Sequence, residues 1–443
     1  MGGPAILRIF AAAIAAAAVA AAPAGAAAET VAASAKMLSG GGGARNTTMN
    51  TLRLGSGRVA YLRYTVPATW AGSDVMLQLD PLDDSAGVVV KKIYARWEDG
   101  ETHKARSYKT VTPITGPALL GWSNSMIDMD SQLKPGKTYT LKLSARSGTV
   151  RIAAIPVLLR STPSAVTAVG DVSCPTTSSR WNGGAGTATR CAQAATAALV
   201  RESDEHLLLL GDIQYQSGGL ADYQSAFALS WGTLASRLRP VPGNHEYYTA
   251  GAAGYFDYFS SIGVTTGDRA TGWYTYDAGA WRVLALNTND ECRVIACGAG
   301  SAQEQWLRNE LVGARAAGKC TLAYWHYPLA SGGLHGDNPW VADLWKAMYE
   351  LGGDVVLTGH DHHYQRFDPL GADGLAAADG PREWVVGTGG YSFYPASERS
   401  GSAKIITDTF GLLRLTLSGD SYAWEWAGVG GAGTDTGSAS CRA

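Results

Sequence analysis

The sequence contains none of the short motifs that mark several large enzyme classes. It has no Gly-x-Ser-x-Gly turn around a serine nucleophile and no Walker phosphate-binding loop, so serine hydrolases and P-loop nucleotide-binding folds are not indicated. No Cys-x-x-Cys pair occurs among the six cysteines, which disfavours a zinc site built on thiolates. An excess of one charge sign is also lacking. The formal net charge of -2 gives no support to nucleic-acid or anionic-membrane binding.

Long apolar runs are confined to the first 28 residues. Arg8 precedes a run of alanine, isoleucine and valine, and small residues at 24–28 offer cleavage sites. This pattern predicts a secretory signal peptide over residues 1–28, and therefore a secreted, extracellular protein without a stable membrane span. The alternative is an uncleaved membrane anchor, which the missing basic flank after the run disfavours.

The cysteines of a secreted chain predict disulfides. Six cysteines allow 15 connectivities. Cys292 and Cys297 are near enough in sequence to close one loop, and Cys174 and Cys191 can close another. Cys320 and Cys441 would then attach the C-terminal tail to a strand.

Residues 29–160 are expected to form a small all-β sandwich domain. Tyr139, Leu141 and Leu143 alternate with polar residues directly after a Lys-Pro-Gly-Lys turn, and a second alternating run begins at Val75. Its tryptophans Trp70, Trp97 and Trp122 have two interpretations, a glycan- or surface-binding face and a buried core. We favour the core, because buried tryptophan is the commoner use. Residues 161–164 are expected to be a linker.

From residue 165 to 443 the pattern changes to strands alternating with helices, which predicts α/β layers. The run Leu207–Leu210 ends in Gly-Asp and is expected to be a strand buried on both faces. The other expected strands are 165–169, 238–242, 281–286, 321–325 and 354–357. Helical patterns cover 190–204, 221–236, 303–317 and 340–351. After residue 384 the chain becomes all-β, which suggests a second sheet packed on the first.

Oxygen and imidazole donors follow the ends of five of these strands. They are Asp171, Asp212 with Tyr215, Asn244 with His245, His326, and His360 with His362. Open α/β sheets bind ligands at the carboxyl ends of their strands, so these side chains are expected to converge. Each one alone is better explained as a turn residue or a buried histidine. Together they suit two metal ions that share a carboxylate, the arrangement used for in-line phosphoryl displacement.

The ordered motifs Gly-Asp, Gly-Asp-x-x-Tyr, Gly-Asn-His-Glu, His and Gly-His-x-His resemble the calcineurin-like metallophosphoesterases, and within them the purple acid phosphatases. The resemblance covers residues 165–426 and includes Val241-Pro242, Tyr364-Gln365-Arg366 and the glycine-rich run 387–390. It implies a four-layer α-β-β-α sandwich, here preceded by the smaller all-β domain. It also implies a secreted acid phosphatase that hydrolyses phosphate monoesters by attack of metal-bound hydroxide.

The resemblance also implies the ligands of two metal ions bridged by Asp212. One ion would be held by Asp171, Asp212, Tyr215 and His362, and the other by Asp212, Asn244, His326 and His360. Ser173 stands where most of the superfamily has a histidine ligand and where this subgroup usually has glycine. A phenolate is a hard anionic donor, so Fe(III) is expected beside Tyr215 and Zn, Mn or Fe in the second position.

Two further histidines are expected to act on the substrate. His245 is similar to the family residue that faces the phosphate and is expected to protonate the leaving group, with His335 assisting. His335 could instead be a surface loop residue. His363 and Arg366 are expected to support the metal ligands or contact substrate, and Asp361 is expected to be structural.

Two alternatives to a phosphomonoesterase remain. The same chemistry would serve a phosphodiesterase or nucleotidase, which paired ester assays would separate. A non-catalytic surface-binding protein is the remote alternative, and the filled ligand positions disfavour it.

Overall fold

The computed structural model describes residues 163–442 without interruption. Before them it describes residues 30–32, 34–38, 45–46, 52–55, 59–70, 74–79, 88–93, 110–114, 125–128, 133–145, 149–152 and 157–161. The expected signal peptide lies outside these ranges, as do Trp97 and Trp122. Within them, no helix is both long and apolar enough to cross a membrane.

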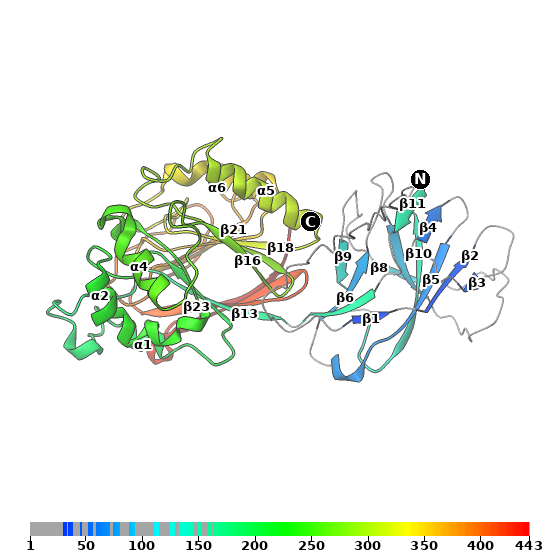
Figure 1. Ribbon diagram of the computed structural model, residues 1–443, viewed down its shortest axis with the longest axis horizontal. Helices are drawn as coiled ribbons and strands as arrows, with labels where there is room; N and C mark the ends of the chain where they lie inside the picture. The colour runs from blue at the N-terminus through cyan, green and yellow to red at the C-terminus, as the bar shows by residue number, and fades with distance from the viewer. Residues whose placement is uncertain are drawn as a thin grey trace, which may run out of the picture.

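The described N-terminal strands form sheets of their own beside the larger α/β part (Figure 1). Side chains from a four-stranded and a six-stranded sheet share one buried core, which includes Leu62, Leu77 and Leu141, as the sandwich prediction requires. Trp70 is fully buried in that core, so it belongs to the packing and not to an exposed binding face. The four-stranded sheet runs β1 (Thr30–Ala32), β12 (Val157–Ser161), β6 (Asp74–Leu79), β9 (Ser125–Asp128). The six-stranded sheet runs β3 (Arg45–Asn46), β2 (Ser34–Leu38), β5 (Val59–Thr65), β10 (Thr138–Ala145), β7 (Val88–Ile93), β8 (Thr110–Ile114), and β4 (Leu52–Gly55) pairs with β11 (Thr149–Ile152).

Two mixed sheets form the centre of the α/β part. The first runs β15 (Leu238–Val241), β14 (His206–Leu210), β13 (Ser164–Val169), β23 (Gly411–Leu417), β24 (Ser421–Gly428), β25 (Thr436–Ser440). The second runs β16 (Tyr274–Ala278), β17 (Trp281–Ala285), β18 (Cys320–Tyr324), β19 (Val355–Thr358), β21 (Arg382–Val386), β20 (Tyr364–Phe367), β22 (Ser402–Ile406). Strands β13, β14 and β15 are parallel, as are β17, β18, β19 and β21.

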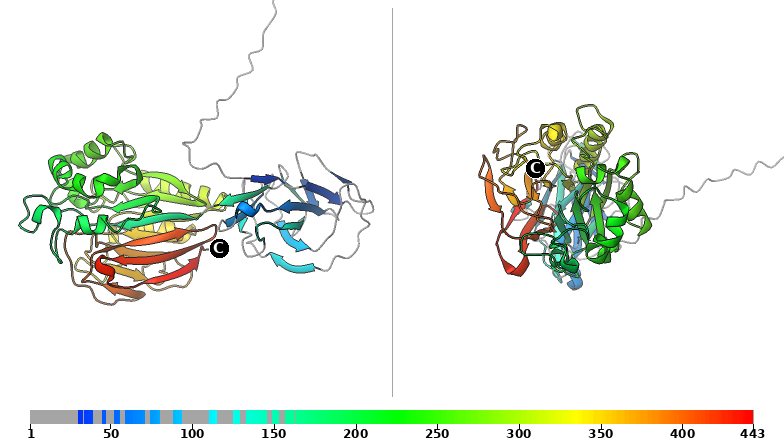
Figure 2. Two further views of the ribbon diagram at one scale, coloured as in Figure 1. Left: turned by 90° about the horizontal axis from the view of Figure 1, so that it is seen from below. Right: turned by 90° about the vertical axis from the view of Figure 1, so that its left-hand side faces the viewer.

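The two sheets pack face to face with helices outside them, which gives the expected four layers (Figures 1 and 2). The inner core combines Leu208 and Leu210 of β14 with Leu322 of β18 and Trp384 of β21. One outer layer contains α1 (Gln193–Ala197), α2 (Leu220–Ser225), α3 (Asn244–Tyr247) and α4 (Ala253–Ser261), and the other contains α5 (Ala302–Ala316) and α6 (Ala342–Glu350).

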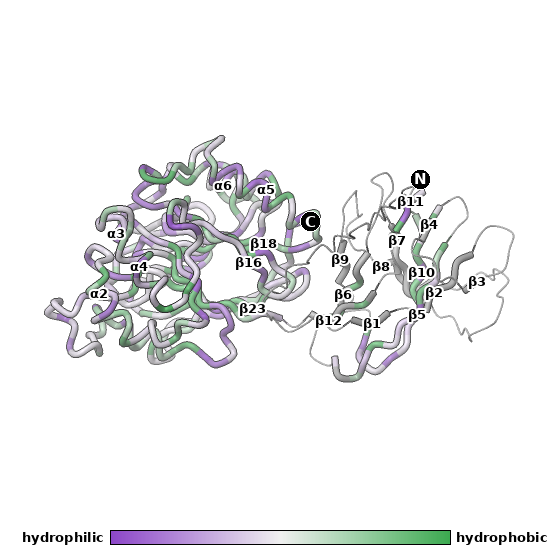
Figure 3. The backbone as a smooth tube through the Cα atoms, in the orientation of Figure 1, coloured by the Kyte–Doolittle hydropathy of each residue, from purple (hydrophilic) through white to green (hydrophobic). Residues whose placement is uncertain are grey.

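Helix α5 illustrates how the sequence selects its layer. Ser301 caps it by accepting a hydrogen bond from the Glu304 amide, at 3.2 Å. Leu307, Leu311 and Ala314 recur at helical spacing and are buried against the sheet. Figure 3 shows hydrophobic and hydrophilic residues alternating along α5 and α6, as a helix packed on one face requires.

Three expectations about this part were wrong in detail. The helix expected over 190–204 is only α1. The 174–191 disulfide fixes its start, and the Arg201 amide donates a hydrogen bond to Asp204 Oδ2 in a turn beyond its end. The stretch 221–236 breaks after α2 into 3-10 turns (Phe227–Leu229 and Trp231–Arg237). The C-terminal strands do not form a separate sheet, since β21 joins the second sheet while β23 pairs with β13 in the first.

All three expected disulfides are present. They join Cys174 to Cys191, Cys292 to Cys297, and Cys320 to Cys441. The described residues leave no free cysteine. The third bond attaches the C-terminal tail to β18, as expected.

Glu246 of α3 connects the turn after β14 to the turn after β15. Its carboxylate is fully buried and accepts backbone hydrogen bonds from Asp212, Ile213, Gln214 and Gly243, at 2.7–3.2 Å. The Tyr223 hydroxyl donates a fifth bond at 3.1 Å. Both oxygens are therefore surrounded by donors, and the backbone that carries Asp212 is fixed by a side chain from the neighbouring strand's loop.

Replacing this carboxylate tests how far it fixes the two turns. Glu246→Gln would direct an amide N–H at buried backbone N–H groups, and we expect a loss of about 3 kcal/mol in the free energy of unfolding, because unpaired buried donors are costly. Urea unfolding followed by circular dichroism measures this. The exposed Glu202→Gln change serves as the control and should stay within about 0.5 kcal/mol of the wild type. Equal midpoints for the two variants would contradict the role of Glu246.

Candidate metal centre

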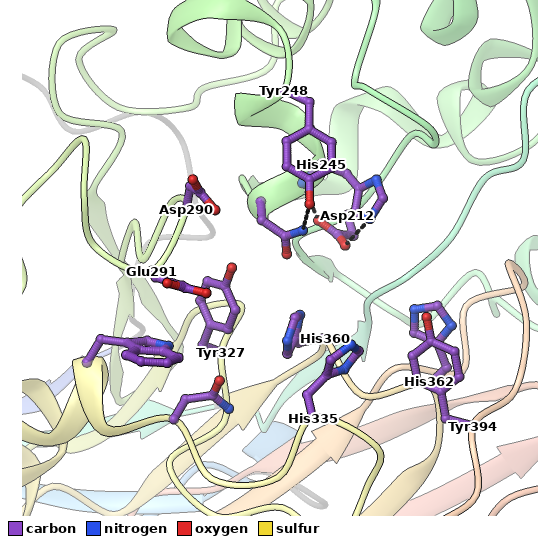
Figure 4. Close-up of a pocket in the computed structure, with 13 residues that line it drawn as sticks. Asp212, His245, Tyr248, Asp290, Glu291, Tyr327, His335, His360, His362 and Tyr394 are labelled. Atoms are coloured by element: carbon purple, nitrogen blue, oxygen red, sulfur yellow. Dashed lines mark hydrogen bonds and ion pairs between the residues drawn. The ribbon is translucent and has the colours of Figure 1, made fainter.

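The expected donor side chains meet at one end of the two sheets. Asp171, Asp212 and Asn244 follow the parallel strands β13, β14 and β15, and His326 and His360 follow β18 and β19. The carboxyl ends of parallel strands lie at the same sheet edge, so residues far apart in the chain become neighbours. Figure 4 shows Asp212, His360 and His362 around the cavity there.

One group of donors surrounds the phenol oxygen of Tyr215. This oxygen lies 2.8 Å from Asp171 Oδ1, 3.1 Å from Asp212 Oδ2 and 3.0 Å from His362 Nε2. His362 Nε2 is also 3.3 Å from Asp171 Oδ1. All four side chains are buried. The structure thus brings together the four side chains predicted for one metal ion.

The second group lies on the other side of Asp212. Asp212 Oδ1 is 3.4 Å from His326 Nε2, which in turn is 3.2 Å from Asn244 Oδ1. Donor atoms of Asp212, His326 and His360 all lie within 4.8 Å of one another. Because Oδ2 faces Tyr215 and Oδ1 faces His326, Asp212 stands between the two groups with one oxygen toward each.

Neighbouring polar groups orient several of these donors. His326 Nδ1 lies 2.7 Å from the Leu210 carbonyl, and His362 Nδ1 lies 2.8 Å from Ser392 Oγ. Asn244 Nδ2 donates to Tyr248 Oη at 3.0 Å, which leaves Asn244 Oδ1 facing the centre. Histidines that bind metals are oriented in this way through their second nitrogen.

The backbone at the strand ends is strained. Asp171, Asp212 and His360 have φ of 60°, 47° and 70°, a region that non-glycine residues rarely adopt. The glycines before two donors leave no room for a side chain. A Cβ on Gly211 would lie 2.5 Å from His326 Nδ1, and one on Gly243 would lie 2.2 Å from Asp212 Oδ1. Both glycines therefore leave space for the neighbouring donors, and Gly211, with φ of 85°, also has a backbone angle that glycine favours.

The protonation of the donors is set by their mutual charges. Burial alone would raise the pKa of Asp212, but the charges of His326 and His245 outweigh it and hold the pKa below its usual range. Burial opposes protonation of His326, yet the Asp212 charge and hydrogen bond raise its pKa to about 9. Burial, followed by the charges of His326 and His335, lowers the pKa of His360 well below its usual value.

The residues present fit two cations. The combined set contains two carboxylates, a phenol, an amide oxygen and three imidazoles, and no thiol. Two buried carboxylates next to a phenol need a compensating positive charge. Oxygen and imidazole donors suit iron, manganese and zinc. A second cluster, Cys320, Asp354 and Cys441, does not qualify, because its sulfurs form a disulfide.

The donors open into a cavity of about 400 Å³ that also contains His245 and His335. His245 Nδ1 lies 2.5 Å from the Gln216 carbonyl and its Nε2 lies 3.7 Å from Asp212 Oδ2. His335 Nδ1 lies 2.9 Å from Asp361 Oδ1, and its ring is 4.3 Å from that of His360. Both predicted substrate-facing histidines thus lie at the cavity, and His335 reaches it from a loop.

The two residues that the motif predicts as supports, His363 and Arg366, do not line the cavity. His363 is fully buried and pairs with Gln365 Oε1 at 3.0 Å, outside the cavity lining. Arg366 binds Asp435 through two hydrogen bonds of 2.8 and 3.0 Å and does not line the cavity. β20 directs Arg366 toward Asp435, and its contact with substrate or support of the metal ligands stays a prediction.

Sequence reasoning missed other contributors. Asp361, expected to be only structural, accepts hydrogen bonds from the ring and the amide of His335. Tyr391 stacks on Tyr215 at 3.5 Å and Tyr394 stacks on His362 at 3.9 Å. The only sequence signal for these tyrosines was their position just after the glycine-rich run 387–390.

Known proteins similar to this chain include phosphoesterases. Residues 165–364 match the family described as Calcineurin-like phosphoesterase. The uncharacterized protein Rv2577 of Mycobacterium tuberculosis is 26% identical over 246 residues, which cover 51% of this chain and 43% of that protein. Purple acid phosphatase 15 of Arabidopsis thaliana is 25% identical over 224 residues, 41% of each chain. The chain thus spans less than half the length of these relatives.

A solved structure shares the fold. Purple acid phosphatase PPD1 from yellow lupin (Lupinus luteus) superposes with a TM-score of 0.52 over 88% of this chain and 74% of its own, at 16% identity. With the four layers, the donors at the strand ends and the matched segment 165–364, this chain is similar to the calcineurin-like phosphoesterases and, among them, to the purple acid phosphatases.

Proposed function

We propose that the protein is a secreted, metal-dependent hydrolase of phosphate monoesters, of the purple acid phosphatase type. The observation that carries the proposal is Asp212, which presents one oxygen to each of two groups of donors. The match of residues 165–364 to the calcineurin-like phosphoesterase family supports phosphoester hydrolysis as the chemistry of such a pair of sites. The tyrosine in one group supports the purple acid phosphatase subgroup.

The donors favour a trivalent ion beside Tyr215. Burial, followed by the charges of Asp171 and Asp212, raises the pKa of this phenol well above its usual value. A strong Lewis acid is needed to ionise it at working pH, so Fe(III) is proposed there. Asp212, Asn244, His326 and His360 would hold the second ion, for which Zn, Mn or Fe fits. Two bound cations would supply Lewis acidity toward water and toward the phosphoryl oxygens.

His245 is proposed to contact the phosphate and to protonate the leaving alkoxide. Its Nδ1–H donates a hydrogen bond to the Gln216 carbonyl, which leaves Nε2 toward the cavity. The ring retains partial exposure, 20% of the side chain, so it can reach a bound substrate. Proton donation to a leaving group by a positioned histidine is typically worth ~10²–10⁴-fold in rate.

His335 is proposed to assist. Its hydrogen bond to Asp361 is the main cause that raises the pKa of the imidazole, and it fixes Nδ1 as the bonded atom. Nε2 is then the nitrogen available to substrate. Asp361 orients this ring and is proposed to act through it.

The remaining features concern location and domains. Three disulfides support an oxidising compartment, which agrees with a signal peptide over residues 1–28 and with secretion. The division into an N-terminal domain, 29–160, and a catalytic domain, 165–443, is proposed on the separate sheets of each part. Glycan or cell-surface contact by the N-terminal domain stays a prediction, which a pull-down with residues 29–160 would test.

Hydrolysis assays test the proposal directly. With a chromogenic monoester and its diester counterpart, we expect the monoester to be cleaved with the larger kcat/KM. Exhaustive chelation should remove activity on both. Full activity after chelation would contradict a metal-dependent reaction, and a preference for the diester would favour the phosphodiesterase alternative.

Spectroscopy tests the ion beside Tyr215. Protein purified without added metal should contain two metal ions per chain, one of them iron, and should absorb visible light through phenolate-to-iron charge transfer. Tyr215→Phe should abolish this band, because it removes the phenolate. Tyr391→Phe, which alters the stacked neighbour but no predicted ligand, should keep it. Elemental analysis measures the metal content and absorption spectra measure the band. A band that persists in Tyr215→Phe would contradict the assignment of Tyr215 as an iron ligand.

Substitution of the catalytic histidine tests its role. We expect His245→Ala to retain both metals and to lower kcat by ~10²-fold or more, because the leaving group then departs without a proton donor. His206→Ala removes an imidazole outside the cavity lining and is the matched control. Unchanged turnover in His245→Ala would remove the proposed role.

A further inference from the structure

One side of the cavity is acidic and aromatic. Its lining includes Asp290, Glu291, Tyr327 and Trp340, but no lysine or arginine. Figure 4 shows Asp290, Glu291 and Tyr327 on the side opposite His362 and Tyr394. An alcohol group that extends toward this side from a phosphate at Asp212 and His245 meets two carboxylates, and a second anionic group there meets no lysine or arginine side chain.

The carboxylates are presented by a rigid loop. Asn289 accepts the Val294 amide at 2.9 Å and donates to the Ile295 carbonyl at 2.8 Å, and the 292–297 disulfide closes the loop. Asn289, Glu291 and Cys292 all have positive φ, of 39°, 51° and 58°. Such strain persists only where surrounding contacts impose it, and it gathers at functional sites. The loop holds its acidic side chains in place before a ligand arrives.

Aromatic residues connect this loop to the metal centre. The Tyr327 ring lies 4.4 Å from that of His360. Tyr327, Asp290 and Glu291 all line the cavity, so their side chains border the same space. Trp340 and Tyr248 also line the cavity and are among the exposed large hydrophobic residues of the described chain, at 38% and 58%. The rim thus offers aromatic faces next to negative charge.

Arg293 partly compensates these carboxylates. It forms ion pairs with Asp290, at 3.5 Å, and with Glu291. Its side chain is 64% exposed and does not line the cavity, so the pairs lie on the solvent side. Exposed pairs of this kind are weak, and they leave the carboxylates able to attract a second cation from within the cavity.

From these observations we propose that Asp290, Glu291, Tyr327 and Trp340 form a leaving-group subsite that selects phosphate esters of alcohols bearing an ammonium group. Carboxylates supply charge complementarity, and aromatic faces attract quaternary ammonium through their quadrupoles. The subsite rests on the proposed phosphoesterase function and specifies its substrate class. Polyphosphorylated esters are disfavoured, because their further phosphates would face Asp290 and Glu291.

A pair of isosteric substrates tests the subsite. Choline phosphate and 3,3-dimethylbutyl phosphate have the same shape and differ in whether the branched atom is a charged nitrogen or a neutral carbon. We expect the full-length, metal-containing enzyme to show a ratio of kcat/KM values of at least ~10 in favour of choline phosphate, as a partly desolvated cation–aromatic and charge contact predicts.

Substitutions identify which side chains cause the preference for choline phosphate. Asp290→Asn combined with Glu291→Gln keeps side-chain shape and should reduce the ratio to about 2 or less, and Trp340→Leu should reduce it by about threefold. Arg293→Ala should increase it, because the competing cation is removed. Glu202→Gln, an exposed carboxylate away from the cavity lining, should leave it unchanged. The ratio is internal to each variant, so partial loss of folded protein does not affect it.

The outcomes separate this inference from the function on which it rests. A ratio near 1 in the wild type, or a ratio unaffected by the double substitution, overturns the subsite while hydrolysis of both esters still supports the phosphoesterase. Absence of turnover with every ester overturns the proposed function and the subsite together. A high ratio that falls in the double variant and rises in Arg293→Ala supports it.

Discussion

Asp212 lies between donors on two sides, with Oδ2 3.1 Å from the Tyr215 oxygen and Oδ1 3.4 Å from His326 Nε2. Such an arrangement places buried acidic and imidazole groups within a few ångströms of one another, and burial of charge is costly unless it is compensated. The fold therefore has to enforce it. It does so from both sides, since the buried Glu246 carboxylate fixes the Asp212 backbone and the Leu210 carbonyl orients His326. Cation binding would offset the remaining cost, so metal content and stability are expected to be linked.

The same constraint accounts for the unusual backbone at the site. In the described part of the chain, nine non-glycine residues have positive φ. Three of them carry donors at strand ends, and three belong to the loop that presents Asp290 and Glu291. Hydrogen bonds, the 292–297 disulfide and close-packed glycines hold these conformations. Strain at both ends of one cavity is consistent with a site whose phosphate end and leaving-group end are both formed in advance.

The sequence was sufficient to predict the features that depend on short stretches of chain. A buried strand, a glycine and a polar residue in succession locate Asp171 and Asp212 at the carboxyl edge of the first sheet and His360 at that of the second, because parallel strands share their carboxyl ends. The order of the strands was not predictable in this way. Strand β23 joins the first sheet through pairing with β13, a contact between segments over 240 residues apart, and no local pattern encodes it. The supporting role of Asp361 and the place of Arg366 also depend on distant partners, His335 and Asp435, which only the folded chain identifies.

Charge is distributed unevenly within the cavity, and this asymmetry bears on specificity. Metal ligands and His245 gather where the phosphate would bind, so the positive charge that attracts a phosphate belongs to that end. At the other end the lining offers only carboxylates, an amide and aromatic rings. A monoester with a neutral alcohol would use only the first end. A monoester with a cationic alcohol would match both, since each end then meets its opposite charge. Because catalysis benefits from binding energy that holds the substrate in one orientation, the acidic loop contributes to the reaction without touching the reacting atoms.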